Sequence, residues 1–386
     1  MPVIPEIAER LERFAEIRRD FHAHPEIGFQ EERTSGIVAD LLRGWGIETH
    51  TGVGGTGVVG IVEGARPGRS IGLRADMDAL PMEEETNLPW RSQTPGVSHA
   101  CGHDGHTATL LAAAQYLSEH RDFPGRVVLI FQPAEEGLGG ARAMLADGLF
   151  DRFPCDEVFG LHNSPYTAPG VVGIKPGVAM AGADFFDVKV RGTGSHAASP
   201  QHARDPIMAA TALVQAFQTI RSRNAPPHEA AVLSVTQIHA GAAYNVVPAE
   251  VTLAGTLRFF SEEARERMRT RMETLAKGIA AGFEMEIEIE FRDIFTVLEN
   301  DAALTDKVLE IAKEVTGAEH TLLQPEAVTG SEDFADMLKA VPGAYFTVGH
   351  KGEVPLHNPG FVFDDEAIPL GASMFVRLVE DRLAAG

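Results

Sequence analysis

Apolar residues follow two different patterns along the chain. Short, continuous apolar runs are typical of buried strands, whereas longer segments with apolar residues at the helical period are typical of helices. The expected strands cover residues 57–64, 70–76, 126–132, 157–163 and 344–350, and the expected helices cover residues 7–24, 34–46, 105–119 and 140–150. Because strands alternate with helices, the pattern predicts an α/β fold with a mixed, mostly parallel sheet and helices on both faces.

The segment 182–293 has a different order of elements. Its pattern predicts strand, helix, strand, strand, helix and strand, which is the βαββαβ order of ferredoxin-like domains. A chain of 386 residues is also long enough for two domains. We therefore expect one domain from residues 1–181 and 294–386, interrupted by an inserted domain from residues 182–293.

The stretch GVGGTG, from Gly52 to Gly57, matches the glycine pattern of dinucleotide-binding loops. That pattern requires a helix directly after the glycines. The residues that follow, VVGIVEG, are rich in β-branched side chains and are typical of a strand. We therefore interpret this stretch as a glycine-rich hairpin rather than a nucleotide site.

Charge and composition exclude several classes of protein. The formal net charge is −22, whereas nucleic-acid-binding proteins carry a basic face, so we expect no nucleic-acid partner and no membrane partner. No apolar run reaches the length of about 18 residues that indicates a membrane span, and the polar N-terminus lacks the apolar core of a signal peptide. The two cysteines, Cys101 and Cys155, do not make a disulfide framework. We expect a cytoplasmic protein.

Cys101 lies in the octapeptide HACGHDGH, which begins at His99 and ends at His106. Cys101 and His103 offer a sulfur and a nitrogen donor, which suit Zn, Mn, Co or Ni ions. The octapeptide precedes an expected helix, and a positive helix end favours a thiolate. A buried cysteine that packs as a small hydrophobe, with histidines that cap the helix, explains this octapeptide equally well.

Candidate metal ligands also follow four of the expected strands. These residues are Asp76 and Asp78, Glu135 and Glu136, His162, and His357. Ligands of open α/β sheets bind at the carboxyl ends of the strands, and two adjacent carboxylates repel each other unless a cation or a proton lies between them. Solvated acids scattered over a surface would not produce this repetition, so the sequence favours a metal site.

The chain also resembles the M20 metallopeptidase family, in its branch of N-acyl amino acid amidohydrolases, which includes hippurate hydrolases and auxin-conjugate hydrolases. The resemblance covers nearly the whole chain and is carried, in order, by FHAHPEIGFQE, GLRADMDALPM, HACGHDGHTA, QPAEEGLGGA, GLHN, GTGSHAASPQHARDPI, NVVPAEVTLAGTLR, TGSEDF and HNPGFVFDD. It implies a two-metal catalytic domain with an inserted lid domain that also forms a homodimer or homotetramer.

The same resemblance implies two divalent metal ions per subunit, which are Mn, Zn, Co or Ni. It implies metal ligands at Cys101, His103, Glu136, His162 and His357. Cys101 would bridge the two ions, and Glu135 would be the general base. Asp76 and Asp78 are then expected to orient ligands rather than bind metal, and the other two histidines of the octapeptide, His99 and His106, are expected to be supports.

The resemblance to the family also implies roles for four residues that are not metal ligands. His196 would stabilise the oxyanion, often from a second subunit, and Gly330 would line the leaving-group pocket. Asn245 and Arg258 would bind the substrate carboxylate, which suits the fork of an Arg side chain. From the residues alone, His196 is an ordinary surface-loop histidine, and Arg258 could instead form an ion pair on the strand face.

Two pairs of residues keep two interpretations each. Glu332 and Asp333 could support the metal site or line the substrate pocket. Phe185 and Phe186 could pack in the core of the inserted domain or contact an aromatic acyl group.

We expect hydrolysis of the amide bond of N-acyl amino acids, such as hippurate, to a carboxylic acid and a free amino acid. This small-molecule substrate and a second copy of the chain would be its partners. Two alternatives stay open: a metal-dependent dipeptidase or carboxypeptidase on the same scaffold, and a non-catalytic ligand-binding protein. A serine hydrolase is excluded because the chain has no GxSxG motif, and Ser195 does not lie in a nucleophile elbow.

Overall fold

The computed structural model describes residues 3–352 and 354–384. These residues divide into two compact units. The first contains the residues up to Ala179, Leu298–Ala327 and the residues from Asp333 onward, and the second contains Met180–Val297 and Val328–Glu332. The last of these segments joins the second unit through the amide of Ala181, which donates to the carbonyl oxygens of Val328 and Gly330 at 3.1 and 3.0 Å.

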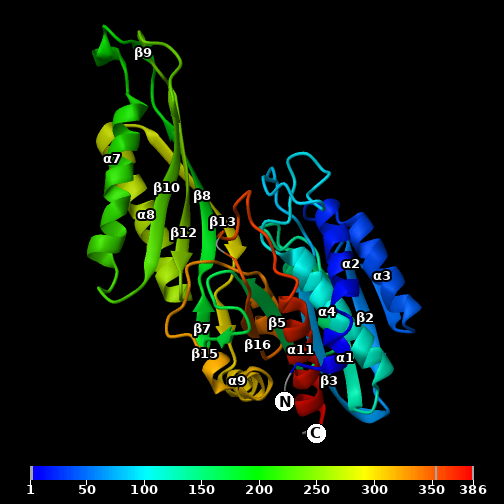
Figure 1. Ribbon diagram of the computed structural model, residues 1–386. Helices are drawn as coiled ribbons and strands as arrows, with labels where there is room; N and C mark the ends of the chain where they lie inside the picture. The colour runs from blue at the N-terminus through cyan, green and yellow to red at the C-terminus, as the bar shows by residue number, and fades with distance from the viewer. Residues whose placement is uncertain (1–2, 353, 385–386) are drawn as a thin grey trace. The chain divides into compact units, whose positions relative to one another are not determined.

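A mixed eight-stranded sheet forms the centre of the first unit, in the order β1-β2-β4-β3-β5-β16-β6-β15. The strands are β1 (Glu48–Val53), β2 (Gly57–Glu63), β3 (Arg66–Asp76), β4 (Pro124–Gln132), β5 (Glu157–Ser164), β6 (Val172–Ile174), β15 (Thr321–Leu323) and β16 (Gly343–Gly349). Strand β3 pairs in parallel with β4 and β5, and β5 pairs in parallel with β16 (Figure 1). The four strands that precede candidate ligands are therefore neighbours with one direction.

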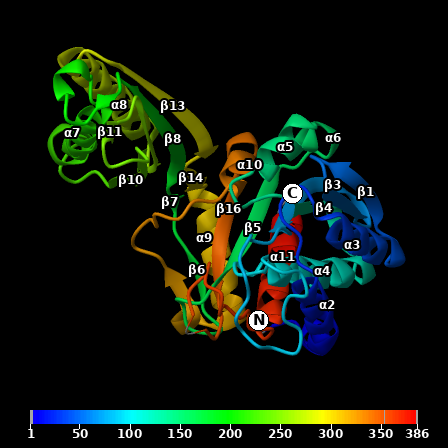
Figure 2. The same ribbon diagram turned by 90° about the horizontal axis from the view of Figure 1, so that it is seen from above.

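Helices cover both faces of this sheet, which confirms the predicted fold class. They are α1 (Pro5–Ala8), α2 (Leu11–Ala23), α3 (Glu32–Gly44), α4 (His103–Glu119), α5 (Gly140–Ala146), α6 (Leu149–Arg152), α9 (Ala302–Thr316), α10 (Phe334–Ala340) and α11 (Ala367–Ala384). Alternate strand residues such as Leu73, Leu129 and Phe159 share one core with Leu111 of α4 and Phe375 of α11. Figure 2 shows α4 and α11 on one side of the sheet and α5 and α10 on the other.

Two of the expected helices are each divided into two. Residues 7–24 were predicted as one helix, but α2 begins only after Arg10, whose φ of −98° and ψ of 7° interrupt the helix. Residues 140–150 form α5 and α6 because Gly148 between them takes φ 78°, a left-handed conformation that a right-handed helix cannot contain. None of the helices in the described ranges combines the length and the apolar character that a membrane crossing requires.

The second unit has the predicted βαββαβ order. Its elements are β8 (Gly182–Arg191), α7 (Pro206–Thr219), β10 (Ala231–Ala240), β12 (Glu250–Phe259), α8 (Glu262–Phe283) and β13 (Glu286–Phe295). The strands form an antiparallel sheet in the order β10-β12-β8-β13. Asp205 and Ser261 cap the two helices by accepting hydrogen bonds from the amides of Ile207 and Ala264. Figure 1 shows α7 and α8 side by side against this sheet.

Shorter elements complete the two units. Short strands form two further pairs, β7 (Gly177–Met180) with β14 (Leu298–Asn300) and β9 (Ser195–His196) with β11 (Val246–Val247). The stretch from Gly52 to Gly57 connects β1 and β2, which pair antiparallel, and Gly54 and Gly55 take φ values of 66° and 103°. This hairpin confirms the interpretation of the glycine-rich stretch.

Candidate metal centre

The carboxyl ends of four adjacent parallel strands bring the candidate residues to one edge of the sheet. Asp76 is the last residue of β3, His162 lies near the end of β5, and the pair Glu135 and Glu136 follows β4. His357 lies in the loop after β16, and its backbone amide donates to the carbonyl oxygen of Ala100 at 2.8 Å. This bond joins the loop of His357 to the segment that carries Cys101.

The segment before α4 contributes Cys101 and His103, separated by Gly102. Gly102 precedes α4 with φ 96°, and a Cβ at this position would lie 2.5 Å from Oδ1 of Asn163. Only glycine fits this left-handed and crowded position. The glycine therefore allows the chain to turn into α4 with a cysteine and a histidine on either side of the turn.

The five expected ligands lie in one cluster of the first unit, and their donor atoms form overlapping groups. In each group the donor atoms lie within 4.8 Å of one another, and the groups are Cys101 with His103 and His162, Cys101 with Glu136 and His357, and His103 with Glu135 and Glu136. Cys101 Sγ lies 3.4 Å from His162 Nε2, and His357 Nε2 lies 3.2 Å from Glu136 Oε1. Cys101, His103 and Glu136 each belong to more than one group, so the groups share donors and form one continuous cluster.

One buried ligand atom in this cluster, Nε2 of His103, has no hydrogen-bond partner among the residues that the structure describes, although buried polar atoms in proteins are nearly always bonded. His103 Nδ1 is held by Asp78 Oδ1 at 3.3 Å, and His162 Nδ1 donates to the carbonyl oxygen of Asn163 at 2.7 Å. Holding one ring nitrogen in this way directs the other toward a metal. The residues therefore fit divalent cations that accept nitrogen, sulfur and oxygen donors.

The charges of the cluster point to the same conclusion. Burial, with the nearby carboxylate of Glu136, raises the pKa of the Cys101 thiol. Hydrogen bonds to Cys101 and Glu136 raise the pKa of His357 to about 10. A bound cation would change this balance, because it stabilises nearby negative charge and deprotonates a thiol that coordinates it.

His106 supports two of the expected ligands and is itself held at both ring nitrogens. Its Nδ1 lies 2.6 Å from Oδ1 of Asp76, and its Nε2 lies 2.6 Å from Oδ1 of Asn163. The His106 ring stacks on that of His103 at 5.4 Å and packs edge-on to that of His162 at 4.5 Å, measured between ring centroids. Asp76 Oδ2 also lies 3.9 Å from Nε2 of His103, so both aspartates are close to this ligand: Asp76 near its Nε2 and Asp78 at its Nδ1.

A buried polar network lies beside the cluster and was missed in the sequence. Asp104 Oδ2 contacts Nδ1 of His22 and NH1 of Arg18, both at 2.9 Å, and Glu84 lies 3.3 Å from Nε2 of His22. His99 is also buried, and burial lowers its pKa to about 4. The network ties α2 to the first turn of α4 beside His103. Its sequence signals were His22 in the motif FHAHPEIGFQE and the octapeptide HACGHDGH, which contains His99 and Asp104.

This network predicts that stability falls at alkaline pH. Burial lowers the pKa of His22, but the charge and hydrogen bond of Asp104 outweigh it and raise the pKa to about 9. A raised histidine pKa stabilises the folded state below the unfolded value of about 6.5, and this contribution is lost as the pH rises through about 9. The shift limits the contribution to about 3 kcal/mol. Thermal unfolding of His22→Gln and wild type, in the same metal state, should differ at pH 6 and converge at pH 10. A constant difference would contradict this origin, and His24→Gln serves as the control.

The remaining expected site residues lie in the second unit. His196, in β9, is exposed and pairs with Val246 of β11, next to Asn245. Arg258 lies in β12 and is half-buried, and its NH1 contacts Oγ1 of Thr256 and the carbonyl oxygen of Leu257. No carboxylate of the described residues forms an ion pair with Arg258, so the ion pair on the strand face is not observed. Burial lowers its pKa.

The structure resolves part of the open interpretations. Asp333 is buried and binds Gln132 Nε2 at 2.7 Å and the amide of Ala141 at 2.9 Å, which anchors β4 to α5. Phe186 is fully buried and packs edge-on against Phe217, with ring centroids 6.2 Å apart. Phe185 lies on the other face of the sheet, where the guanidinium of Arg292 lies 6.0 Å from its ring. Gly330 and Glu332 belong to the segment Val328–Glu332 of the second unit.

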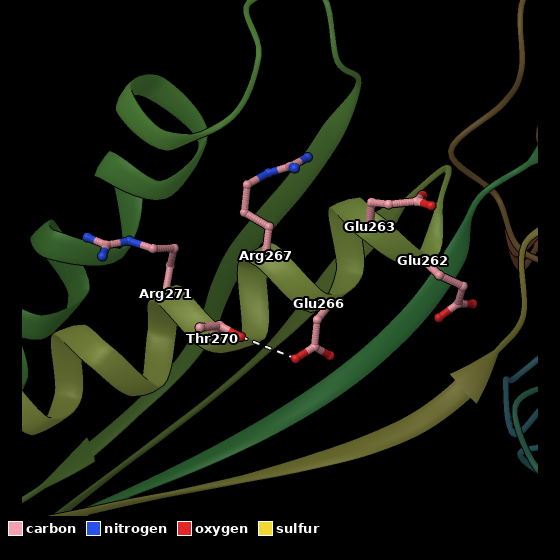
Figure 3. A pocket seen from close by; sticks show the side chains of 6 residues that line it. All are labelled: Glu262, Glu263, Glu266, Arg267, Thr270 and Arg271. Atoms are coloured by element: carbon pink, nitrogen blue, oxygen red, sulfur yellow. Dashed lines mark hydrogen bonds between the residues drawn. The ribbon is translucent and has the colours of Figure 1, made fainter.

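A surface hollow on α8 is not a chemical site. It is lined by Glu262, Glu263, Glu266, Arg267, Thr270 and Arg271. Figure 3 shows these side chains along one helix, with a hydrogen bond of 3.2 Å from Thr270 Oγ1 to Glu266 Oε1. Such mixed charges at helical spacing are typical of a solvated helix face.

Comparison with known proteins identifies the family. Peptidase family M20/M25/M40 matches residues 72–381 of the chain. The chain belongs to peptidase family M20. This M20 protein is 40% identical to a hippurate hydrolase of Campylobacter jejuni over 98% of both chains. It is also 40% identical to an N-acetyl-L-cysteine deacetylase of Bacillus subtilis, over 93% of this chain and 85% of the relative.

Two further matches bear on the peptidase alternative and on the metal. A protein of Saccharolobus solfataricus named thermostable carboxypeptidase 1 is 37% identical over 92% of both chains. A solved Bacillus subtilis structure, described as a dinuclear metal binding peptidase from the M20 family, is 34% identical with a TM-score of 0.85 and covers 98% of this chain and 99% of its own. This M20 protein is therefore a metal-dependent hydrolase that acts on amide bonds, as predicted.

Proposed function

We propose that this M20 hydrolase cleaves the amide bond of N-acyl amino acids and releases a carboxylic acid and a free amino acid. The proposal depends chiefly on the five-donor cluster at the sheet edge, with a second glutamate, Glu135, directly beside the donor Glu136. The likeness to a hippurate hydrolase over 98% of the chain supports the substrate class. The domain from residues 1–181 and 294–386 would be catalytic, and the inserted domain would form the lid and the contact between subunits.

In this proposal the cluster would hold two divalent ions, and Cys101 would be the ligand that they share. His103, Glu136, His162 and His357 complete the set. Two ions held together can acidify a shared water toward a pKa of about 7, which supplies a nucleophile at neutral pH. Mn, Zn, Co and Ni all suit these donors.

Glu135 is the general base of the proposal. It lies in the turn after β4 and is 6% exposed. It would take a proton from the attacking water and deliver it to the leaving amine nitrogen, because an amine leaves an amide readily only when protonated. This task requires a carboxylate that does not serve as a ligand, so the two adjacent glutamates carry separate roles.

The second unit would recognise the substrate. Arg258 and Asn245 would bind the free carboxylate, Gly330 would line the leaving-group pocket, and His196 would donate to the oxyanion, contributed by the partner subunit of a homodimer or homotetramer. Among the described residues no carboxylate forms an ion pair with Arg258. This supports the proposed role of Arg258 as the carboxylate anchor, because a half-buried guanidinium without an ion-pair partner suits an anionic ligand. The proposed place of action is the cytoplasm.

Substitution of the proposed carboxylate anchor should affect binding more than turnover. Arg258→Ala should raise KM for N-acyl amino acids by about 10- to 100-fold, the usual value of a hydrogen-bonded ionic contact. The methyl esters of the same substrates should show a much smaller change. Arg292→Ala is the control, since Arg292 lies on the same sheet but pairs with Asp187 at 2.6 Å. An equal change for acids and esters would remove the anchor role.

A dipeptidase or carboxypeptidase on the same scaffold is the second candidate, favoured by the likeness to the thermostable carboxypeptidase. A substrate panel separates the two candidates. It contains hippurate, acetyl-, long-acyl- and indoleacetyl-amino acids, and dipeptides, each with Mn²⁺ or Zn²⁺ and with a chelated control. Chelator-sensitive release of amino acids from the N-acyl compounds supports our proposal. Cleavage of dipeptides alone supports the peptidase, and no cleavage with any metal supports a ligand-binding protein.

A further inference from the structure

The backbone on both sides of Glu135 is held by buried carboxylates. The amide of Ala134, just before Glu135, donates to Oε1 of Glu31 at 2.8 Å. The amide of Glu136, just after it, donates to Oδ2 of Asp78 at 3.0 Å. Glu135 therefore lies between two anchored peptide groups. Asp78 also contacts the expected ligand His103, whereas Glu31 contacts none of the expected ligands.

The residue that Glu31 holds has an unfavourable backbone conformation. Ala134 takes φ 55°, in the left-handed region that residues with a Cβ rarely adopt. Gly28 packs closely against this turn: a Cβ on Gly28 would lie only 2.9 Å from Cα and Cβ of Ala134. The segment 28–31 thus encloses the turn, and a conformation of this kind persists only where its surroundings hold it.

The Glu31 carboxyl group links the turn at Ala134 to the hairpin between β1 and β2. It is fully buried, and among the residues that the structure describes no Lys, Arg or His forms an ion pair with it. Its Oε2 accepts a hydrogen bond of 2.5 Å from Oγ1 of Thr56. A buried carboxyl group without a cation is costly to retain, and burial raises the pKa of Glu31 to about 7. Its two oxygens act as hydrogen-bond acceptors, Oε1 for the amide of Ala134 and Oε2 for the hydroxyl of Thr56.

We propose that Glu31 is a positioning residue for Glu135: it stabilises the left-handed turn at Ala134 and so directs the Glu135 side chain toward the reacting water. This inference rests on the proposed function, in which Glu135 is the general base. It assigns a task to the last residue of the motif FHAHPEIGFQE. The role requires a hydrogen-bond acceptor and not a negative charge.

Three variants test the proposal by kinetics and metal content. Glu31→Met keeps the buried volume but has no comparable acceptor, and its kcat should fall by about 10- to 100-fold, the usual effect of a misplaced catalytic group. Its KM and its bound metal should stay near the wild-type values. Glu31→Gln should keep most of kcat, since its amide oxygen still accepts from Ala134 and the Thr56 hydroxyl can turn to accept. The control is Glu26→Gln, because Glu26 bonds the amides of Arg33 and Thr34 instead.

Hydrogen exchange of the Ala134 amide tests the turn without any substrate. Exchange should be faster in Glu31→Met than in wild type and nearly unchanged in Glu31→Gln.

If Glu31→Met does not fold, the double variant Glu31→Ala with Ala134→Gly takes its place, because glycine adopts φ 55° freely. The kcat of this double variant should exceed that of Glu31→Ala alone. Wild-type kcat and exchange in Glu31→Met, or equal losses in Glu31→Met and Glu31→Gln, would overturn the proposal. A wild type that cleaves no N-acyl amino acid would refute the proposed function instead, while exchange would still report on the turn.

Discussion

Glu135→Gln is expected to keep its bound metal and to lose about 10²- to 10⁴-fold in kcat, the usual contribution of a positioned proton-transfer group. Glutamine has nearly the same shape as glutamate but cannot take a proton from water. Because Glu135 is not an expected ligand, the metal content should match that of the wild type. The measurement combines steady-state kinetics on an N-acyl amino acid with elemental analysis of the bound metal.

The neighbouring residue provides the matched control. Glu136→Gln should lose bound metal, because it removes a charged donor from the cluster, and excess metal should restore part of its activity. The same substitution at two adjacent positions would then have two different effects: loss of the general base at Glu135 and loss of a metal ligand at Glu136. Near-normal turnover in Glu135→Gln would exclude the general-base role, and metal loss in that variant would make Glu135 a ligand.

Cys101→Ser should lower metal occupancy more than any other single change in the cluster. Serine replaces an anionic thiolate with a neutral hydroxyl, which is a weak ligand for these ions. As the proposed bridging ligand, Cys101 would contribute to the binding of both ions, so its loss should weaken both together. Metal analysis after dialysis, at several free-metal concentrations, measures the effect.

Cys155→Ser is the natural control, since these are the two cysteines of the chain. Burial raises the pKa of Cys155 to about 12, and its Sγ contacts the carbonyl oxygen of Phe153 rather than any expected ligand. The variant should keep two ions and wild-type activity. A Cys101→Ser protein that also retains two tightly bound ions would rule out the bridging assignment.

Much of the fold was predictable from sequence because its strands are short, apolar and bounded by polar ends. The split order of the second unit was also visible, since its helices and strands differ sharply in period. Single residues caused the errors: φ 78° at Gly148 divides one predicted helix, and no apolar pattern marks such a break. The glycine-rich hairpin was recognised from the strand that follows it.

The candidate cluster was predictable for a different reason. Parallel strands end at one edge, so residues far apart in sequence, such as Asp76, Glu136 and His162, are brought together by topology alone. The contacts that support the cluster have no such signal. Asp104 meets His22 across 82 positions, and Glu31 meets Ala134 across 103. These pairs depend on how the N-terminal segment packs, which hydrophobic period does not specify.

The central claim is that two ions bound by this cluster support cleavage of N-acyl amino acids. The most direct measurement titrates Mn²⁺ or Zn²⁺ into metal-depleted protein while hippurate cleavage and bound metal are followed together. The account predicts no cleavage in the depleted protein and full cleavage only when two ions are bound per chain. Cleavage that persists without metal, or that reaches its maximum with one bound ion, would contradict it.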